Sequence, residues 1–344
     1  MSQKKWPMVS VVVINFKGTS QLEKCLTHLV RTNYPNFEVI VIDCLTDNLE
    51  SWIKQRFPNV KVVHYDYDIG PSASHNVGKH VLNPESKYIA FVDNDAYVTE
   101  NWLTELVKVM ENDEKIGVAQ AKLLVTFNEK LMDNAGLAID FLGTWYSTRG
   151  LKAEAFQEVM ELFAASSAGC LVRMGVFDEA GGFDPEYFIY DDDTDFSFRV
   201  RLLGYKIVLV PSAIVFHNGD PIKALNPRKL RHSIKNRVYT MVKNYEFKNL
   251  LWRFIIYYLL TVSACAGFAA VGHFLEAKET FNGLFHPLLN FREILKKRAV
   301  IQSSRKVKDS ELFKLGFIRN DIRATIMEFK LRAKQILYNS FNNR

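Results

Sequence analysis

Tyr88-Ile89-Ala90-Phe91-Val92-Asp93-Asn94-Asp95 is the stretch of this 344-residue sequence that most sharply limits the fold. An apolar run that ends abruptly in two carboxylates is typical of a buried strand followed by a loop. Carboxylate oxygens one residue apart are suitable ligands for Mg²⁺ or Mn²⁺. Capping and turn formation ahead of a helix at Glu100 would explain the same residues, so both interpretations stay open here.

Three similar apolar runs precede this stretch, and each is followed by polar residues and then by a helical pattern. They are Val9 to Ile14, Val39 to Ile42 and Val60 to Val63. Strands that alternate with helices predict an α/β fold with a mostly parallel sheet covered by helices on both faces. Ligands of such sheets bind beyond the carboxyl ends of the strands. The polar residues at those ends are Asn15, Asp43, Asp66 to Asp68, and Asp93 to Asp95.

A second acidic cluster, Asp191 to Asp193 with Asp195, follows an aromatic stretch. The apolar pattern after it has helical spacing and stops at Gly204, which predicts a helix over 193–203. Adjacent carboxylates repel, so one of them is expected to have a raised pKa unless a cation or hydrogen bonds compensate. Such a group suits a general base, whereas capping of the helix is the alternative explanation.

Two short apolar runs follow the predicted helix, and the second ends at a histidine. They are Ile207 to Val210 and Ile214 to Phe216, ahead of His217. A histidine at a strand end near carboxylates can bind a metal, although a lone histidine is more often a hydrogen-bonded structural residue. Between Ile116 and Ser147 the pattern is weak and predicts only short strands.

The overall composition excludes several classes of protein. Hydrophobic residues at 48% and charged residues at 24% are close to globular averages, which argues against a disordered or multi-span membrane chain. The four cysteines have neither metal nor redox spacing, so we expect buried thiols in a reducing compartment. The first strand is not followed by Gly-x-Gly-x-x-Gly, which disfavours a dinucleotide-binding oxidoreductase.

Basic residues gather in two runs that account for much of the net charge of +6. The first run is Lys223, Arg228, Lys229, Arg231, Lys235, Arg237, Lys243, Lys248 and Arg253. The second is Arg292, Lys296, Lys297, Arg298, Arg305, Lys306 and Lys308. Such runs suggest anionic lipid, phosphate or nucleic acid as a partner, and solvated helix faces are the alternative.

The segment between the two basic runs is apolar. Phe254 to Leu275 contains no charged residue and is long enough to cross a hydrocarbon core of about 30 Å. Because both flanks are basic, a re-entrant hairpin bent near Ala264 to Gly267 fits better than a single span, which places positive charge on one side. A buried helix in a globular core is the alternative.

Taken in order, these motifs resemble glycosyltransferase family 2, whose members have the GT-A fold, over about residues 9–244. The similarity is to single-sugar transferases, among them rhamnosyltransferase-like and polyprenyl-glycan-assembling members. It rests on Val9 to Asn15, Val41 to Asp43, Asp68 to Gly70, His75 to Gly78, Asp93 to Asp95, Gly181 to Asp184, Tyr190 to Asp195, Arg199 to Tyr205 and Val215 to His217.

The resemblance implies a role for each matching position. The nucleotide sugar is expected to contact Asn15, Asp43, Gly70, Asn76 and Asp93. The divalent metal, Mg²⁺ or Mn²⁺, is expected at Asp95, His217 and Asp93. Asp193 is the expected catalytic base, with Asp192 beside it.

This chain departs from the family pattern at three positions. Asp68 and Cys44 stand where asparagine is usual, and Asp192 replaces the commoner glutamate. These changes leave the nucleotide base and the sugar unspecified, whereas the metal and base positions match. The Gln-x-x-Arg-Trp motif of processive synthases does not follow Arg199, which favours addition of a single sugar.

The resulting hypothesis is an inverting glycosyltransferase of glycan biosynthesis on the cytoplasmic face of the cell membrane. We expect a catalytic domain over 1–245, with a nucleotide-sugar half to about 115 and an acceptor half after it, and a helical membrane-associating region over 246–344. Its expected partners are a nucleotide diphosphate sugar, a glycan or polyprenyl-linked acceptor and an anionic membrane surface, not nucleic acid. The alternatives are a nucleotidyltransferase and a catalytically silent membrane scaffold.

Overall fold

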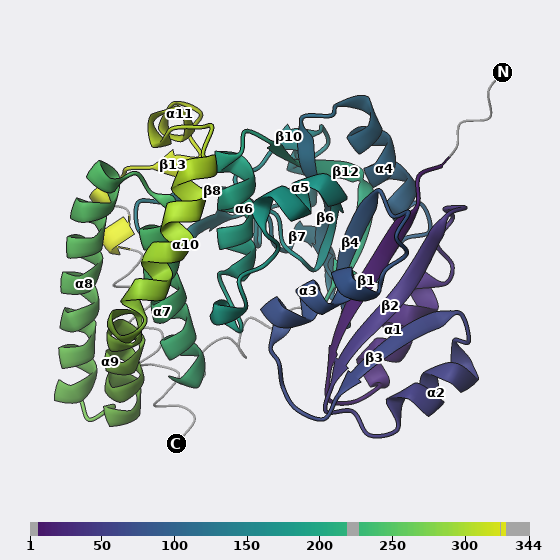
Figure 1. Ribbon diagram of the computed structural model, residues 1–344, viewed down its shortest axis with the longest axis horizontal. Coiled ribbons are helices and arrows are strands. Elements are labelled where there is room, and N and C mark those ends of the chain that lie inside the picture. The colour runs from purple at the N-terminus through teal and green to yellow at the C-terminus, as the bar shows by residue number, and fades with distance from the viewer. Residues whose placement is uncertain (1–5, 219–226, 324, 328–344) are drawn as a thin grey trace. The chain divides into compact units, whose positions relative to one another are not determined.

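The computed structural model describes residues 6–218, 227–323 and 325–327 (Figure 1). The chain forms two compact units. The sheet unit comprises the chain up to Leu137, Ser147–Phe188 and the segment that begins at Gly204. The helical unit comprises Ala138–Tyr146, Ile189–Leu203 and the C-terminal part of the chain.

The predicted domain boundary at residue 245 coincides with neither unit. Residues 138–146 and 189–203 belong to the helical unit although they lie well before that boundary. Both units are built from separate stretches of chain, which a division along the sequence cannot describe. A catalytic region ending at 245 and a membrane-associating region after it therefore stay a prediction.

One large sheet forms the centre of the sheet unit. Its strands are β1 (Val9–Phe16), β2 (Phe37–Cys44), β3 (Val60–Tyr65), β4 (Tyr88–Asp93), β5 (Ala96–Val98), β6 (Ile116–Val125), β7 (Asn128–Met132), β10 (Met160–Glu161), β11 (Gly169–Arg173) and β12 (Lys206–His217). Their order is β10-β12-β6-β11-β4-β1-β2-β3, with β5 paired to β12 and β7 to β6. β1 to β4 are parallel, as are β6 and β12, while β11 runs antiparallel between them.

Helices alternate with strands along the chain, as the sequence pattern predicts. They are α1 (Ser20–Leu29), α2 (Leu49–Arg56), α3 (Pro71–Val81), α4 (Trp102–Asn112) and α5 (Met174–Ala180), with short 3₁₀ turns at η1 (Ala153–Ala155) and η2 (Pro185–Tyr187). α1 buries Leu22, Cys25, Leu26 and Leu29, which recur at helical spacing. The predicted α/β class with a mostly parallel central sheet is confirmed.

Two strands differ from the expectation. β6 is buried at all of its positions, from Ile116 to Val125. The sequence predicted only short strands here, because Gly117, Gln120 and Lys122 interrupt the apolar run, although both faces of β6 are covered. The two runs before His217 form the single strand β12, whose register with β6 shifts between Val210 and Ile214. Pro211 lies in this gap and has no N–H to donate to the ladder.

The helical unit contains six helices in its described residues. They are α6 (Asp192–Leu202), α7 (Pro227–Asn244), α8 (Phe247–Ala270), α9 (Phe274–Leu289), α10 (Phe291–Ser304) and α11 (Asp309–Lys314). A small sheet pairs β8 (Gly136–Asp140) with β9 (Trp145–Ser147) and with β13 (Ile318–Arg319). The predicted helix over 193–203 is confirmed within one residue at each end, and Gly204 has the positive φ of +88° expected after a helix.

The apolar segment lies mainly in α8, which is continuous through the predicted bend at Ala264 to Gly267. The chain reverses later, between α8 and α9, where Gly272 has a φ of +81°. The predicted position of the bend is therefore wrong, because the left-handed residue that the reversal needs is Gly272. Among the described helices, α8 has the length and composition to cross a membrane, and only 17% of its most apolar window is buried. That exposure excludes the alternative of a buried core helix.

Several residues of the basic runs are internal to the helical unit. Lys243 is 1% exposed, and its Nζ lies 2.9 Å from the carboxylate of Asp195. Arg298 donates hydrogen bonds to the carbonyl oxygens of Val242 and Tyr245, near the end of α7. A cation at a helix C-terminus satisfies carbonyl groups that have no partner within the helix. For such residues the prediction of a basic surface that faces a partner is wrong.

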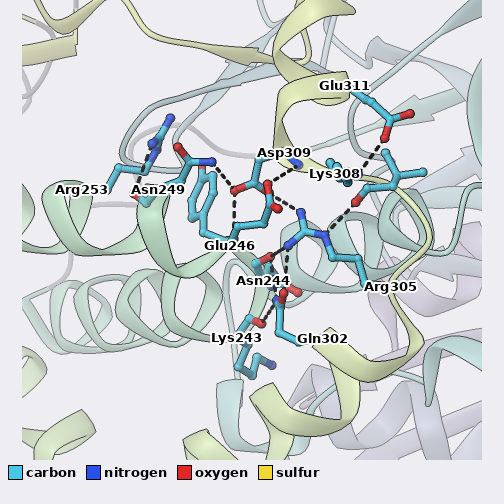
Figure 2. A network of polar contacts seen from close by, with 12 residues as sticks. Lys243, Asn244, Glu246, Asn249, Arg253, Gln302, Arg305, Lys308, Asp309 and Glu311 are labelled. Atoms are coloured by element: carbon cyan, nitrogen blue, oxygen red, sulfur yellow. Dashed lines mark hydrogen bonds and ion pairs between the residues drawn. The ribbon is translucent and has the colours of Figure 1, made fainter.

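Figure 2 shows how this polar network continues toward α11. Arg305 donates to the carbonyl oxygen of Asn244 at 3.2 Å and is paired with Asp309. Asp309 is fully buried and also accepts from the backbone N–H of Glu246 at 2.9 Å. A buried carboxylate is stable only when hydrogen bonds and a cation compensate its charge.

Of the predicted basic residues, Lys223 lies outside the described residues, as does the side chain of Arg228.

Candidate functional site

Three polar side chains lie side by side where β1, β2 and β3 end. Asn15 is in register with Asp43, and Asp43 is in register with His64. The amide nitrogen of Asn15 donates to Oδ1 of Asp43 at 2.6 Å. Nδ1 of His64 lies 2.7 Å from Oδ2 of the same carboxylate. In-register parallel strands therefore bring Asn15 and Asp43 together, as predicted from their strand-end positions.

Asp43 is fully buried and its carboxylate accepts several hydrogen bonds. Besides Asn15 and His64, the hydroxyl of Thr46 donates to it at 2.7 Å and the backbone N–H of Thr46 at 3.2 Å. The hydrogen bond to Asp43 raises the pKa of His64 above its usual value. The more exposed His64 ring thus covers Asp43, so contact of Asp43 with a nucleotide stays a prediction. His64 directly follows a predicted strand, a position that could have marked it.

The loop after β4 is tied to β1 and lies against the end of β12. Asn94 donates from its amide to Oδ1 of Asn15 at 2.7 Å. His217 pairs with Ala96 across β12 and β5, which places its ring beside the two carboxylates of the loop. Nε2 of His217 is 3.3 Å from Oδ1 of Asp95 and 3.8 Å from Oδ2 of Asp93. The three predicted metal ligands are thus brought together.

Asp133 holds the other side of the His217 ring. It follows β7, is 1% exposed, and its carboxylate is hydrogen-bonded to Nδ1 of His217. Its second oxygen is 3.1 Å from the guanidinium of Arg149. A carboxylate on one ring nitrogen fixes the orientation of a histidine and directs the other nitrogen to the metal. Sequence reasoning missed Asp133, since no motif marks it and it lies 84 positions from His217.

The donor set fits a hard divalent cation. The ligand atoms of Asp93, Asp95 and His217 lie within 4.8 Å of one another. Octahedral Mg²⁺ with bonds of about 2.1 Å would separate its ligand atoms by about 3 to 4 Å. Burial opposes a proton on His217, but hydrogen bonds to Asp133 and Asp95 outweigh it and raise the pKa of His217 to about 10. The residues therefore favour a positive charge at this position, and a divalent cation bound at Nε2 would supply it in place of the proton.

Gly70 and Asn76 lie at the start of α3 and along it, where they shape the surrounding loops. Gly70 has a φ of +76°, and a Cβ there would lie 2.6 Å from the Phe188 ring. The side-chain amide of Asn76 donates to the carbonyl oxygen of Phe183 at 2.7 Å and accepts from its N–H at 2.9 Å. Asn76 thus fixes the loop before η2, and nucleotide contact by either residue stays a prediction.

Asp192 and Asp193 begin α6, in the helical unit. Asp192 is 8% exposed, and Oδ1 of Asp193 accepts a hydrogen bond from the backbone N–H of Thr194 at 2.8 Å. The preceding residues Tyr190 and Asp191 have φ values of +68° and +57°, in the left-handed region. Such strain persists only when neighbouring groups impose it, and it is concentrated at functional sites.

Asn236 supplies that restraint from α7. Its side chain is fully buried, and Nδ2 donates to the carbonyl oxygens of Ile189 and Tyr190, both at 2.8 Å. The strained turn that delivers Asp192 and Asp193 is therefore held by a residue more than forty positions later in the chain. Sequence reasoning missed Asn236, which lies within a basic run.

Asp195, the last member of the acidic cluster, is structural. It is fully buried and bound by Arg199 at 2.9 Å, Lys243 at 2.9 Å and the amide of Asn244 at 2.9 Å. These contacts attach α6 to α7. The repulsion expected within the cluster is thus compensated at Asp195 by cations and a hydrogen bond.

Comparison with known families gives the same assignment as the motifs. Residues 7–239 match the model of the glycosyltransferase-like family 2. The chain belongs to glycosyltransferase family 2. The match spans the strands, the Asp93 loop and the start of α6, so it includes every predicted site residue. A nucleotidyltransferase, the rival enzyme class, is thereby disfavoured.

Individual relatives and a solved structure agree with this family. The O-antigen biosynthesis protein RfbC of Myxococcus xanthus is 27% identical over 229 residues, which cover 62% of this chain and 17% of that protein. The N-acetylglucosaminyl-diphospho-decaprenol L-rhamnosyltransferase of Mycobacterium tuberculosis is 45% identical over 53 residues, covering 15% of this chain and 17% of that protein. The similarity to rhamnosyltransferase-like members is confirmed.

The solved structure of GalNAc-T7 with UDP, GalNAc and Mn²⁺ superposes with a TM-score of 0.58 at 18% identity. The likeness covers 72% of this chain and 49% of that chain. Because the identity is low, this likeness shows the fold alone. The predicted GT-A fold of this family 2 glycosyltransferase is thereby confirmed.

Proposed function

We propose that this protein is an inverting glycosyltransferase that moves a sugar from a nucleotide diphosphate donor to a hydroxyl group. The observation that carries the proposal is the convergence of Asp93, Asp95 and the Asp133-oriented His217 at a strand end of a family 2 chain. A divalent cation held there would neutralise charge that develops on the departing diphosphate.

The reaction is a single displacement with Asp193 as base. The acceptor oxygen forms a bond to the anomeric carbon while the bond from that carbon to the diphosphate oxygen breaks. The acceptor proton passes to the Asp193 carboxylate, and the nucleoside diphosphate leaves. Attack from the side opposite the leaving group inverts the anomeric centre. A positioned base contributes about 10²- to 10⁴-fold of rate.

The proposed acceptor is a hydroxyl group of a lipid-linked glycan on the cytoplasmic face of the cell membrane. A polyprenyl phosphate is the alternative acceptor, and its anionic oxygen would attack without the base. Two observations support a lipid-linked acceptor: the exposed apolar helix α8, and the relative that by its name acts on a decaprenyl diphosphate sugar. The four cysteines are free, which fits a reducing compartment. Cys25, Cys44 and Cys170 are buried as the sequence predicts, whereas Cys265 is partly exposed.

A panel of nucleotide diphosphate sugars with Mn²⁺ tests the proposal. The protein should release nucleoside diphosphate from one donor, faster when a polyprenyl diphosphate sugar is added. The product's anomeric coupling in proton NMR should show inversion. A protein that neither binds nor cleaves any donor would be the silent scaffold instead.

Asp133→Asn should weaken metal binding and leave the fold intact. The neutral amide no longer favours the ring orientation and polarity that direct Nε2 of His217 to the metal, so affinity for Mn²⁺ should fall about 10- to 100-fold. Electron paramagnetic resonance of free Mn²⁺ measures this directly. Saturating Mn²⁺ should restore much of the activity, which a misfolded variant would not regain.

Asp113→Asn is the matched control, because Asp113 pairs with Lys206 on the same unit and plays no part in this site. Equal Mn²⁺ affinity of the Asp133→Asn variant and the wild type would show that Asp133 does not position His217.

A further inference from the structure

One face of α8 exposes large apolar side chains along most of its length. The exposed residues recur every three or four positions and so share one side of the helix. They are Phe247, Leu251, Ile255, Leu259 and Val262, and each is about half exposed or more. Monomeric soluble proteins rarely expose a continuous apolar strip of this size, which indicates that something covers it.

The neighbouring helix α9 repeats the same arrangement. Phe274, Phe281, Phe285 and Leu288 are exposed and lie on one side of that helix. The two helices run antiparallel, since Tyr258 donates to the carbonyl oxygen of Leu284 at 2.9 Å, and Cys265 further along α8 contacts Ala277, earlier on α9. Figure 1 shows α8 and α9 beside each other.

The opposite face of α8 is fastened to the rest of the helical unit. Arg253 is fully buried and donates to the side-chain oxygen of Asn320 at 2.6 Å (the helix is at the left of Figure 2). Tyr257, one turn later, is 2% exposed and donates to a carbonyl oxygen of α7. The helix therefore has an anchored face and a free apolar face.

Charge on the two helices is distributed unevenly. α8 contains no acidic residue, and Lys248 is its exposed charged residue. On α9 the acidic Glu276 is 5% exposed, whereas Lys278 is exposed and the neighbouring Glu279 is partly exposed. Further cations, Arg292 and Lys296, are exposed on α10, although Lys296 is paired with Glu293. The free face is thus apolar, and cations outnumber carboxylates among these exposed charged residues.

From these observations we infer that α8 and α9 dock side-on against one leaflet of an anionic lipid bilayer and do not cross it. The inference deepens the membrane association of the proposed function and rests on it. Apolar side chains would enter the acyl boundary while Lys248 and Lys278 meet anionic headgroups. A second copy of this chain fits less well, because two such faces would bring cations of like sign together.

Crossing the bilayer would conflict with the anchored face and with the lengths of the helices. A spanning α8 would take Arg253 into hydrocarbon or break its bonds to Asn320, and intramembrane arginine is costly. Its partner α9 has 16 residues, a length of about 24 Å, which is too short for a hydrocarbon core of about 30 Å. Side-on docking keeps every anchoring contact.

Flotation of the full chain with phosphatidylcholine vesicles, with and without phosphatidylglycerol, tests the docking. The protein should float with both kinds of vesicle and more strongly with those that contain phosphatidylglycerol. Salt should remove only the additional binding that phosphatidylglycerol provides. The double variant Ile255→Ser/Leu259→Ser should bind at least about tenfold more weakly, since it removes apolar burial. The control Val30→Ser/Val159→Ser alters two residues of similar exposure in the sheet unit and should float like the wild type.

The orientation is tested with Lys248→Cys and Ala270→Cys, one at each end of α8, after the protein is added to preformed vesicles. An impermeant maleimide should label both from outside, above the wild-type background. Protection of one end would show a span and overturn the inference. A dimer that sedimentation detects without lipid, and that the double variant dissociates, would also overturn the inference. Equal flotation of the double variant and the wild type would overturn it as well.

Donor cleavage in detergent separates this inference from the proposed function. The double variant should cleave the donor at the wild-type rate, because the changed residues lie outside the site. Cleavage without flotation would refute the docking alone. Flotation without cleavage of any donor would refute the glycosyltransferase proposal and leave a membrane-docking protein.

Discussion

Asp95→Asn should reduce sugar transfer by about 10³-fold or more, because it removes a charged ligand from the proposed metal site. An amide oxygen is a weaker ligand than a carboxylate, and the remaining Asp93 and His217 would hold the cation less tightly. The measurement is the initial rate across a Mn²⁺ titration. Wild-type protein treated exhaustively with EDTA should lose activity to a similar extent and recover it with Mn²⁺.

The fold should survive the change at Asp95, since relief of its repulsion with Asp93 offsets the loss of its contact with His217, whose ring Asp133 still holds. Thermal unfolding of Asp95→Asn should therefore show little change in stability. Asp113→Asn again serves as the control for removal of a carboxylate. Full activity in Asp95→Asn, or in EDTA-treated wild type, would be incompatible with metal assistance.

Asp193→Asn should lower turnover by about 10²- to 10⁴-fold while donor and metal affinity persist. Asparagine keeps the shape of the side chain and its acceptor for the N–H of Thr194, but it cannot take up the acceptor proton. The strained turn held by Asn236 should remain, since its hydrogen bonds use backbone carbonyls of Ile189 and Tyr190. The measurement is kcat with saturating acceptor, alongside the dissociation constants of donor and Mn²⁺.

Asp178→Asn provides the comparison for this variant, because Asp178 is a helix carboxylate paired with Lys79 and outside the site. Asp192→Asn tests the neighbouring assignment. Should Asp192→Asn be inactive while Asp193→Asn turns over normally, the base is Asp192. Unchanged turnover in both variants would exclude this pair as the source of the base.

Local patterns predicted the core of the sheet unit well. β1 and β4 are apolar and continuous, and both begin where the sequence predicts. Both strands could be predicted because a β-branched run bounded by polar residues is a property of neighbouring residues. β6 was harder, since Gln120 and Lys122 interrupt its apolar run. Both are buried because tertiary partners satisfy them: Gln120 accepts from the N–H of Ser166, and Lys122 donates to the carbonyl oxygen of Phe156.

The candidate site divides in the same way. Asp93 and Asp95 could be chosen from the sequence, since a parallel sheet places strand ends at one edge whatever the details of packing. His217 needed the resemblance, because its own surroundings resemble those of any strand-end histidine. Its neighbour Asp133 had no signal at all, since the loop after β7 meets β12 only through pairing of both strands with β6.

The basic runs show the opposite case, in which a strong sequence signal was misleading. Lys243 and Arg305 belong to the basic runs, but they are internal partners of buried carboxylates. Whether a cation faces solvent or a carboxylate depends on which helix packs against it, and the sequence of one helix does not contain that information.

The sequence by itself determined the fold class, the family and the strand ends that carry carboxylates, because periodicity and motif order are properties of neighbouring residues. Only the tertiary structure decided which of the polar groups meet. It placed Asp133 behind His217, Asn236 beneath the turn before Asp192, and an anchored face opposite the free apolar face of α8. These relations join residues far apart in the chain, so they depend on how the strands and helices pack, which no local pattern specifies.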